Sequence, residues 1–430
     1  MARKMKDSGI EWIGEIPEEW SKNKCLRLFN VIGSGTTPKS LVSDESPSIN
    51  WIQSGDINGT LLFSCKNTIS ESTFSQYSAL KTYSAPFIII AMYGASIGNI
   101  SISFIDGCVN QACCVLSVPL CNLDYAFYAI KSAQFYLVQK AVGGGQPNIS
   151  QDTIKQLWIP QPSLAVQEAI ANSLNKACSH IDAILTKTRT SIEEYKKLKQ
   201  AVITQAVTKG VRGEREMKDS GVEWIGEIPK EWVIQKIKSI SSRINVGVVI
   251  RPSEYFDENG TVPFLRGINV KEYLISSNNM VYINESSNHI LSKSQVHTDD
   301  ILIVRDGSIG TSCVVPAEYD GANVVSMVIV TPSISCDSRF TCYSLNSDVG
   351  KTQFTLTKIG SALTHTSVSA VSDIIVAVPS CTEQKEISDY LDTKCAEIDK
   401  LIAKKEQLVK ELESYKKSLI YEVVTGKREV

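Results

Sequence analysis

The 430-residue sequence lacks any apolar run near the roughly 20 residues that a membrane-spanning helix needs. Its longest apolar stretch, "APFIIIAMYGA" at Ala85–Ala95, predicts a buried strand. The first residues, "MARKMKDSG", have no apolar segment behind their charges, so we expect no signal peptide. None of the twelve cysteines forms a CxxC pair, which argues against a redox motif or a zinc knuckle. These absences predict reduced thiols and a cytoplasmic protein.

Catalytic motifs are missing as well. The sequence has no GxxxxGK[ST] phosphate loop, no GxSxG, no HExxH and no HxE…PCxxC pattern. The Asn/Asp-Pro-Pro-Tyr tetrapeptide of adenine methyltransferases is absent too. The four histidines do not cluster with the cysteines, and we interpret Asp299, Asp300 and Asp306 as a solvated turn and a strand end, not as a metal site. We therefore expect no catalytic centre, metal or cofactor in this chain.

The chain also lacks an excess of positive charge. It carries 44 Lys and Arg against 46 Asp and Glu, a formal net charge of −2. A protein that binds nucleic acid alone usually carries more positive charge, because it must neutralise phosphates. Either the chain does not bind DNA, or partner subunits supply most phosphate contacts while this chain reads bases.

What the sequence does contain is a long internal repeat. "MKDSGIEWIGEIPEEW" begins at Met5 and "MKDSGVEWIGEIPKEW" at Met217, with fourteen of sixteen positions identical. A second pair of segments, 162–208 and 379–425, aligns without gaps. Each half therefore consists of a shared opening box, a variable middle and a shared closing segment. Matches between the closing segments include Gln167/Gln384, Ile170/Ile387, Leu174/Leu391, Cys178/Cys395, Ile181/Ile398, Asp182/Asp399 and Val207/Val424.

The closing segments are predicted to be long helices. Eight of eleven positions in two heptad rows are apolar, in the same register in both halves. Two unrelated surface helices are the alternative, but shared register and length favour a mutual pair, antiparallel if the halves follow a pseudo-two-fold axis. The rows hold Ile170, Leu174, Ala177, Ile181, Ile184, Tyr195, Leu198 and Val202, and in the second half Ile387, Leu391, Ile398, Leu401, Leu408, Leu412, Tyr415 and Leu419.

The variable middles are predicted to be mixed domains with many short strands. "FIIIAMYGASIGNISIS" in the first corresponds to "DILIVRDGSIGTSCVVP" in the second, and "INWIQSGDING" corresponds to "VPFLRGINVK". Each middle ends in a small polar loop, Gly143–Ser150 or Gly360–Ser367. One scaffold with two different sets of polar loops predicts two recognition modules for different targets.

Three features together carry a family resemblance: the SGxEWIGEIPxxW box, the closing helix that ends in VTKG or VTGK, and the Gly-Ser-Ile-Gly turn. They resemble the specificity subunit of Type I restriction–modification systems, twice and over essentially the whole chain. The resemblance implies that two target recognition domains read the halves of a split sequence in double-stranded DNA. It also implies docking of two methyltransferase (M) subunits and up to two restriction (R) subunits. Those partners would use S-adenosylmethionine, ATP and Mg²⁺ and carry out adenine-N6 methylation and DNA cleavage.

The expected fold class is α/β (α+β). Two pseudo-symmetric domains of short strands and helices are joined by two long helices that form an antiparallel coiled coil. The box residues are expected to be structural, because identical residues cannot read different sequences; they are Trp12, Ile13, Ile16, Pro17 and Trp20, with Trp224, Ile225, Ile228, Pro229 and Trp232. The expected boundaries are 1–158 with box 5–20, helix 159–216, 217–376 with box 217–232, and helix 377–430.

Base-reading residues are predicted among long polar side chains on the loops that differ between the halves. By residue type, Arg266 and Arg305 are candidates to bind a guanine edge, and Gln146 or Asn148 an adenine edge. Phosphate contact or plain surface is the alternative for each candidate. The candidates are Lys39, Gln53, Ser54, Tyr93, Gln146 and Asn148 in the first domain, and Arg251, Arg266, Asn269, Arg305, Thr364 and His365 in the second.

Two other functions fit the same sequence. One is a specificity module for a fused methyltransferase-nuclease, which differs only in the partner. The other is a coiled-coil adaptor whose two β-rich domains bind protein or glycan instead of DNA. The near-neutral charge is the only feature that supports the adaptor.

Overall fold

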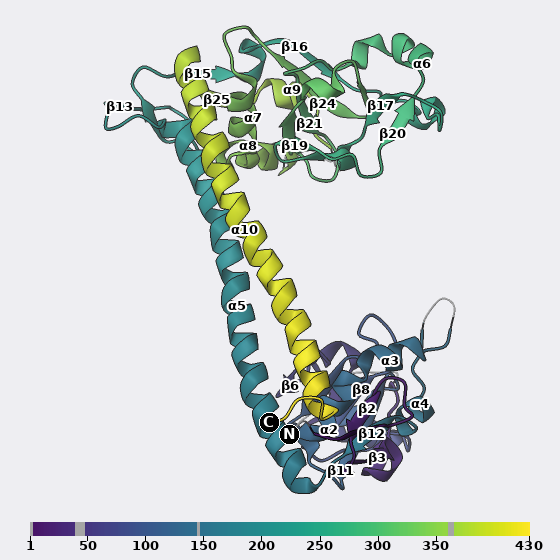
Figure 1. Ribbon diagram of the computed structural model, residues 1–430. Coiled ribbons are helices and arrows are strands. Elements are labelled where there is room, and N and C mark those ends of the chain that lie inside the picture. Colours follow the sequence, from purple (N-terminus) through teal and green to yellow (C-terminus); the bar gives the residue numbers. More distant parts are fainter. Residues whose placement is uncertain (1–2, 39–47, 144–146, 360–364) are drawn as a thin grey trace. The chain divides into compact units, whose positions relative to one another are not determined.

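A computed structural model describes residues 3–38, 48–143, 147–359 and 365–430 (Figure 1). The chain forms two compact units, residues 1–188 with 407–430, and residues 189–406. The long helices α5 (Leu164–Lys209) and α10 (Cys381–Val424) each contribute to both units. The first unit is therefore discontinuous along the chain, whereas the second is one continuous segment.

The first unit contains two larger sheets that share no strand, beside the two-stranded sheets β1-β2 and β12-β3. The larger sheets have the strand orders β4-β11-β8-β9-β6 and β10-β5-β7. Besides parts of α5 and α10, the unit holds β1 (Met5–Asp7), β2 (Glu15–Pro17), β3 (Ser21–Lys24), η1 (Cys25–Arg27), β4 (Phe29–Gly33), β5 (Ser48–Ile52), η2 (Ser54–Asp56), β6 (Leu61–Leu62), β7 (Asn67–Ser70), α1 (Glu71–Gln76), β8 (Phe87–Ala91), β9 (Ile100–Ser103), β10 (Cys108–Val109), β11 (Cys113–Pro119), α2 (Leu123–Ser132), α3 (Gln134–Gln139), α4 (Gln151–Lys155) and β12 (Trp158–Gln161).

The central strand β8 explains the apolar run seen in the sequence. It is antiparallel to β11 and to β9. Ile88 and Ile90 pack in one core together with helix α2, while Phe87, Ile89 and Ala91 pack in a second core. Because both faces of the sheet are covered, the strand is apolar at every position instead of alternating.

The second unit repeats this plan. Its larger sheet has the order β16-β24-β21-β22, and its smaller sheet the order β20-β17-β23. Strand β17 is antiparallel to β20 and parallel to β23, just as β5 is antiparallel to β7 and parallel to β10. The elements of this unit are β13 (Met217–Asp219), β14 (Glu227–Pro229), β15 (Val233–Lys236), η3 (Ile237–Ser239), β16 (Ser241–Val246), η4 (Pro252–Tyr255), β17 (Val262–Leu265), η5 (Gly267–Asn269), β18 (Val270–Lys271), β19 (Leu274–Ile275), β20 (Val281–Ile283), α6 (Glu285–Ile290), η6 (Ser292–Ser294), β21 (Ile301–Val304), β22 (Ser312–Val314), η7 (Ala317–Tyr319), β23 (Asn323–Val324), β24 (Met327–Pro332), α7 (Ser338–Asn346), α8 (Asp348–Ile359), α9 (Val368–Ser372) and β25 (Ile375–Val378).

The same capping positions start corresponding helices in the two units. Asn122 caps α2 and Asp337 caps α7, each by accepting from a backbone N–H in the first turn. Ser150 and Ser367 cap α4 and α9 in the same way. These side chains satisfy donors that a helix start leaves free, so the repeated caps fix equivalent helix starts.

The opening boxes anchor each domain to the long helices. Each box forms a hairpin, β1–β2 or β13–β14. Ile13, Ile16 and Trp20 are buried in a core with residues of α5 and α10, and the equivalent residues of the second box are buried in the same way. The expected structural role is confirmed for these residues. Trp224, by contrast, is 38% exposed and lies outside the core.

Helices α5 and α10 run antiparallel within each unit (Figure 1). In the first unit Lys416 pairs with Asp182 at 2.6 Å, and in the second Lys199 pairs with Asp399 at 2.6 Å. The acidic partners in these two ion pairs, Asp182 and Asp399, are matched positions of the sequence repeat. The antiparallel pairing of the closing helices is therefore confirmed.

One of the two rows of the predicted seam is wrong at half of its apolar positions, although its first members, Ile170 and Ile387, are buried as predicted. Leu198, Leu401, Leu408 and Tyr415 are exposed by 41–49%. The buried stripe of α5 instead combines the row that contains Leu174 with a row that was not predicted. That second row holds Cys178, Leu185 and Ile192. Each helix packs on its own domain as well as on the other helix, and this second contact rotates the buried stripe.

Candidate nucleic-acid interface

Three polar segments of the first unit lie together although they are far apart in the sequence. The Ser96 hydroxyl donates to the Ser54 carbonyl at 2.8 Å, which ties the turn after β8 to helix η2. Ile149 N donates to the Met92 carbonyl at 2.8 Å, which ties the loop before α4 to the same turn. Three loops thus form one composite surface.

The second unit brings together the equivalent three segments. Arg305 Nε donates to the Thr366 carbonyl at 2.9 Å, and Thr366 N donates back to the Arg305 carbonyl at 3.1 Å. These bonds join the turn after β21 to the loop before α9. Gly267 of η5 packs against Val304, where an added Cβ would lie 3.4 Å from Cγ1.

Glycines shape the turn in both units. Gly98 and Gly310 close it with φ of 78° and 88°, in the left-handed region that favours glycine. A Cβ on Gly98 would lie 2.6 Å from a methyl group of Val138, and one on Gly310 would lie 2.4 Å from the Phe354 ring. The shared turn motif therefore sets the backbone frame and leaves the neighbouring side chains free to differ.

The clearest difference between the units falls at one position of this frame. Gln53 follows β5 and precedes η2, while Arg266 follows β17 and precedes η5. The backbone N–H of each is held by a side chain three residues on, Asp56 at 2.8 Å or Asn269 at 3.0 Å. At this equivalent backbone position, the first unit therefore carries the amide of Gln53 and the second unit the guanidinium of Arg266.

Both side chains are half-buried and only partly used by the protein. Gln53 Oε1 accepts from Asn67 Nδ2 at 3.2 Å. Arg266 donates through one Nη to the Asn279 carbonyl, while its Nε has no partner among the described residues. The Arg266 Nε is buried, so the hydrogen-bonding capacity left for an external ligand lies in its Nη groups and in the Gln53 amide.

Tyr93 and Asn148 flank Gln53's loop cluster from the neighbouring segments. They are paired as an isolated antiparallel bridge, and the Asn148 side chain is exposed. Burial raises the pKa of the Tyr93 phenol, although a hydrogen bond with Gln111 opposes the shift. A neutral phenol can both donate and accept, so Tyr93 suits polar recognition at physiological pH.

The remaining candidates are less concentrated. Arg251 is exposed and pairs with Glu254 at 3.2 Å, and His365 is half-buried next to Thr366. The Ser54 backbone carbonyl accepts the hydrogen bond from the Ser96 hydroxyl in the turn after β8. Three candidates, Lys39, Gln146 and Thr364, lie outside the described residues.

Asn269 differs from the surface residue that the sequence suggested. It is fully buried, and its side-chain Nδ2 donates to the carbonyls of Ser276 and Asn278, both at 3.0 Å. Its Oδ1 accepts from Arg266 N. All of its hydrogen bonds hold the loop that carries Arg266, which leaves its amide no free edge for a base.

Sequence reasoning missed a fourth segment at each surface. Gln111 contacts Tyr93 in the first unit and accepts from the Thr37 hydroxyl. At the equivalent place in the second unit, the Ser326 hydroxyl donates to Asp306 Oδ2 at 3.2 Å. No motif marks these positions. The one signal that the sequence offered for Gln111 and Ser326 is that they lie just before β11 and β24, the strands that pair with β8 and β21.

The described residues hold no group of three or more His, Cys, Asp or Glu side chains arranged for a metal ion. Asp300 is buried and paired with Arg243 at 2.9 Å, so it is structural. No helix in the described part of the chain is long and apolar enough to cross a membrane.

A duplicated frame that presents different polar side chains defines a protein with two related recognition units. The family model of the Type I restriction modification DNA specificity domain matches residues 17–194 and again residues 229–411. These matches cover most of the chain, so the chain belongs to this family and contains the domain twice.

Relatives and a solved structure agree with this assignment. The putative type I restriction enzyme MjaX specificity subunit of Methanocaldococcus jannaschii is 25% identical over 96% of this chain and 95% of its own. The MjaVIII specificity subunit of the same organism is 26% identical over 70% of this chain and 69% of its own. A chain solved in work on complex assembly and conformational transition of the type I R-M system shares the fold, with a TM-score of 0.74 at 14% identity, over 95% of this chain and 98% of that one.

Proposed function

We propose that this chain is the specificity subunit of a Type I restriction–modification complex and that each of its two units reads one half of a split DNA sequence. The observation that carries the proposal is the shared loop frame with Gln53 in one unit and Arg266 in the other. A symmetric dimer reads the same half-site twice, whereas two diverged units in one chain read two different half-sites.

The chemistry of these two residues suits different bases. Arginine binds guanine O6 and N7 with two parallel donors, and glutamine binds adenine N6 and N7 through its amide. Tyr93 and Asn148 in the first unit, and Arg305 and His365 in the second, surround them as further contacts to bases or phosphates. Lys39, Gln146, Thr364 and Arg251 complete the proposed interface, with Ser54 as a backbone contributor.

The long helices are the proposed docking surface for two methyltransferase subunits and, through them, up to two restriction subunits. Leu401, Leu408 and Tyr415 repeat every seven residues on α10 and are exposed by 41–48%. An apolar row at this spacing is a surface that a further helix covers in helix-to-helix packing. Partners on this row would also supply the phosphate contacts that a chain of net charge −2 lacks.

Catalysis belongs to those partners in this proposal. The methyltransferase subunits would bind S-adenosylmethionine and the restriction subunits ATP and Mg²⁺, while this chain contributes recognition. The complex would act on DNA in the cytoplasm.

The deciding experiment is modification-sensitive long-read sequencing of DNA from cells with and without this gene, both carrying the neighbouring methyltransferase gene. A split motif with methyladenine on opposite strands, present only with the gene, is the expected result. If purified complex binds duplex DNA but methylation does not depend on the chain, the specificity role is wrong. If no complex binds DNA, a protein- or glycan-binding adaptor replaces it.

A further inference from the structure

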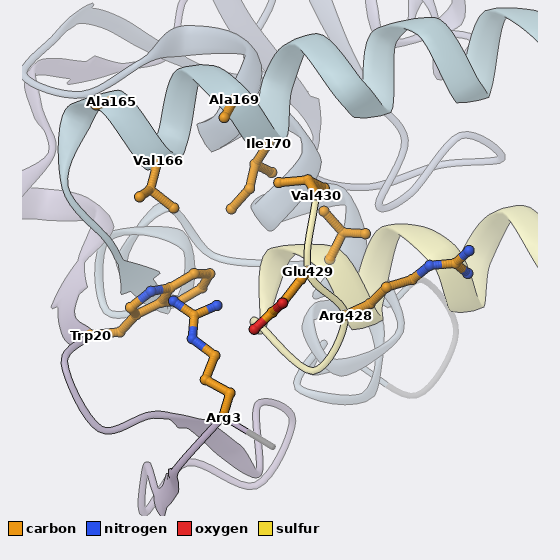
Figure 2. A pocket seen from close by; sticks show the side chains of 10 residues that line it. Arg3, Trp20, Ala165, Val166, Ala169, Ile170, Arg428, Glu429 and Val430 are labelled. Atoms are coloured by element: carbon orange, nitrogen blue, oxygen red, sulfur yellow. The ribbon is translucent and has the colours of Figure 1, made fainter. Parts of the chain in front are cut away.

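A pocket of about 420 Å³ opens in the first unit where the opening box meets the start of α5 and the end of α10 (Figure 2). One wall carries Trp20 with the guanidinium of Arg3 beside it. The opposite wall is apolar and includes Val166, Ile170 and Val423. The pocket thus combines a cation, an indole and an apolar floor.

The equivalent place in the second unit shows what such a pocket binds. Arg215 lies 5.3 Å from the ring centroid of Trp232, as Arg3 lies 5.2 Å from that of Trp20. The carboxylate of Glu383, which is 2% exposed, contacts both Arg215 and Trp232. Trp232 Nε1 donates to Glu383 Oε2 at 3.2 Å, and Arg215 Nη1 lies 2.7 Å from Oε1. This arrangement is a built carboxylate site.

The first unit keeps the cation and the indole but lacks the acid. Val166 occupies the helix position that Glu383 occupies in the second unit, and the first turn of α5 has no acidic residue. Within the described part of the chain, the one carboxylate that Arg3 contacts is that of Glu19. Its counterpart Arg215 forms ion pairs with two carboxylates: Glu231, which is equivalent to Glu19, and Glu383.

Glu429 is the acidic side chain among the residues that line the pocket, and Figure 2 shows it at the border. It makes no ion pair among the described residues and is exposed. The equivalent residue of the second unit, Arg212, has the opposite charge and binds Glu386 at 2.8 Å. The tails of the two units therefore do not fill their sites in the same way.

We infer that the pocket of the first unit receives a carboxylate side chain from a partner polypeptide, with an apolar side chain next to it. Arg3 and Trp20 bind the carboxylate as Arg215 and Trp232 bind Glu383, and the N-terminus of α5 adds a favourable dipole. Val166 and Ile170 pack on the apolar neighbour. The inference rests on the proposed function, because the partner is the subunit that docks on the long helices. Since the second site is filled by the chain's own Glu383, two copies of that partner bind with unequal affinity.

The test is titration of the purified chain with the methyltransferase subunit, followed by mass photometry and calorimetry. We expect two binding steps for the natural chain that differ by roughly tenfold in Kd. Val166→Glu supplies an internal carboxylate like Glu383, and Arg3→Gln removes the cation. Both variants should lose the tighter step and bind both copies with the weaker affinity.

Ser78→Glu is the matched control, because it adds the same charge at an exposed position of the first unit outside the long helices and away from the pocket. It should keep both steps, and thermal melts should show that all variants fold. The inference is overturned if the tighter step persists in both pocket variants, or if the natural chain binds two copies equally. It is also overturned if Glu429→Gln lowers the melting temperature and removes the tighter step, since the chain's own tail would then occupy the pocket. Failure of the natural chain to bind any methyltransferase subunit would instead refute the proposed function.

Discussion

A single residue position carries the proposed difference between the two half-sites. Arg266→Gln should change the preferred base at one position of the second half-site and leave the first half-site unchanged, because the backbone frame stays the same. A lost bidentate contact corresponds to about 1–3 kcal/mol of discrimination. The measurement is the methylated motif of cells that carry the variant. Arg27→Gln, at an exposed arginine of η1 outside the proposed interface, is the control and should leave the motif intact. Equal loss at both half-sites would contradict the assignment.

A buried lysine gives the first unit a distinctive dependence on pH. Burial, with a smaller contribution from Lys416, lowers the pKa of Lys131 to about 8, and its ammonium donates to the Gly59 carbonyl at 2.5 Å. The unfolded chain therefore binds more protons than the folded chain between pH 8 and about 10.5, so this residue makes stability rise with pH in that window.

Lys131→Met removes that contribution. Below pH 8 the variant should be more stable than the natural chain, and the difference should shrink by about 2 kcal/mol as the pH rises to 10. Thermal unfolding followed by circular dichroism between pH 7 and 10 measures it. Lys66→Met, at an exposed lysine, should show no such change. A difference that is constant across this range would contradict the low pKa of Lys131.

At the scale of elements, the repeat predicted most of the architecture. The closing helices, the box anchors and the buried strand at Ala85–Ala95 follow from strong periodicity, and the structure has them. One heptad row was wrong at Leu198, Leu401, Leu408 and Tyr415, because a heptad pattern describes a helix with one partner, and here each helix also packs on a domain.

The candidate site was predictable only as a set of loops. The diverged segments around Gln53 and Arg266 do meet in space, but the sequence could not show that Asn269 is buried or that Gln111 contacts Tyr93. Such contacts depend on how non-local strands such as β5 and β10 are paired, and a pattern within one strand does not encode its neighbour.

Matched glutamines fix each recognition domain to its helix. Gln384 Oε1 accepts from Asp337 N at 2.8 Å and Nε2 donates to the Pro379 carbonyl at 3.0 Å; Gln167 makes the equivalent bonds to Asn122 N and the Pro162 carbonyl, both at 2.9 Å. Because the carboxamide is buried, Gln384→Ala leaves a backbone N–H and a carbonyl without partners and should cost about 2–4 kcal/mol.

That cost should appear in one unit only. Hydrogen exchange should accelerate around α7 in Gln384→Ala and around α2 in Gln167→Ala, each variant serving as the control for the other. Acceleration in both units by either variant would show that the domains do not unfold independently.

At the scale of the whole molecule, the charge balance and the duplication lead to the same conclusion. A chain with net charge −2 has little long-range attraction for phosphate. The described candidate residues of its recognition loops include three arginines, Arg251, Arg266 and Arg305. Under the proposed function, its contribution to DNA binding is therefore selectivity, and partner subunits supply the electrostatic affinity. The duplication provides two selective surfaces in one chain, and the helices α5 and α10 are the covalent link between them.

If these helices set the distance between half-sites, shortening them should shorten the DNA spacer. Asp182 pairs with Lys416 in the first unit and Lys199 with Asp399 in the second; a single antiparallel register through both pairs predicts residues 189–195 opposite residues 403–409. Deleting both heptads preserves the helical phase to within about 20° and removes about 10 Å of helix, close to three base pairs of DNA.

The expected outcome is a methylated motif with unchanged half-sites and a spacer about three base pairs shorter. Replacing the same segments by shuffled heptads of equal length is the control and should keep the natural spacer. Where methylation is lost, selection from a duplex library with random spacers still reports the preferred length. An unchanged spacer after the deletion would mean that the partner subunits, and not this helix pair, measure the distance along DNA.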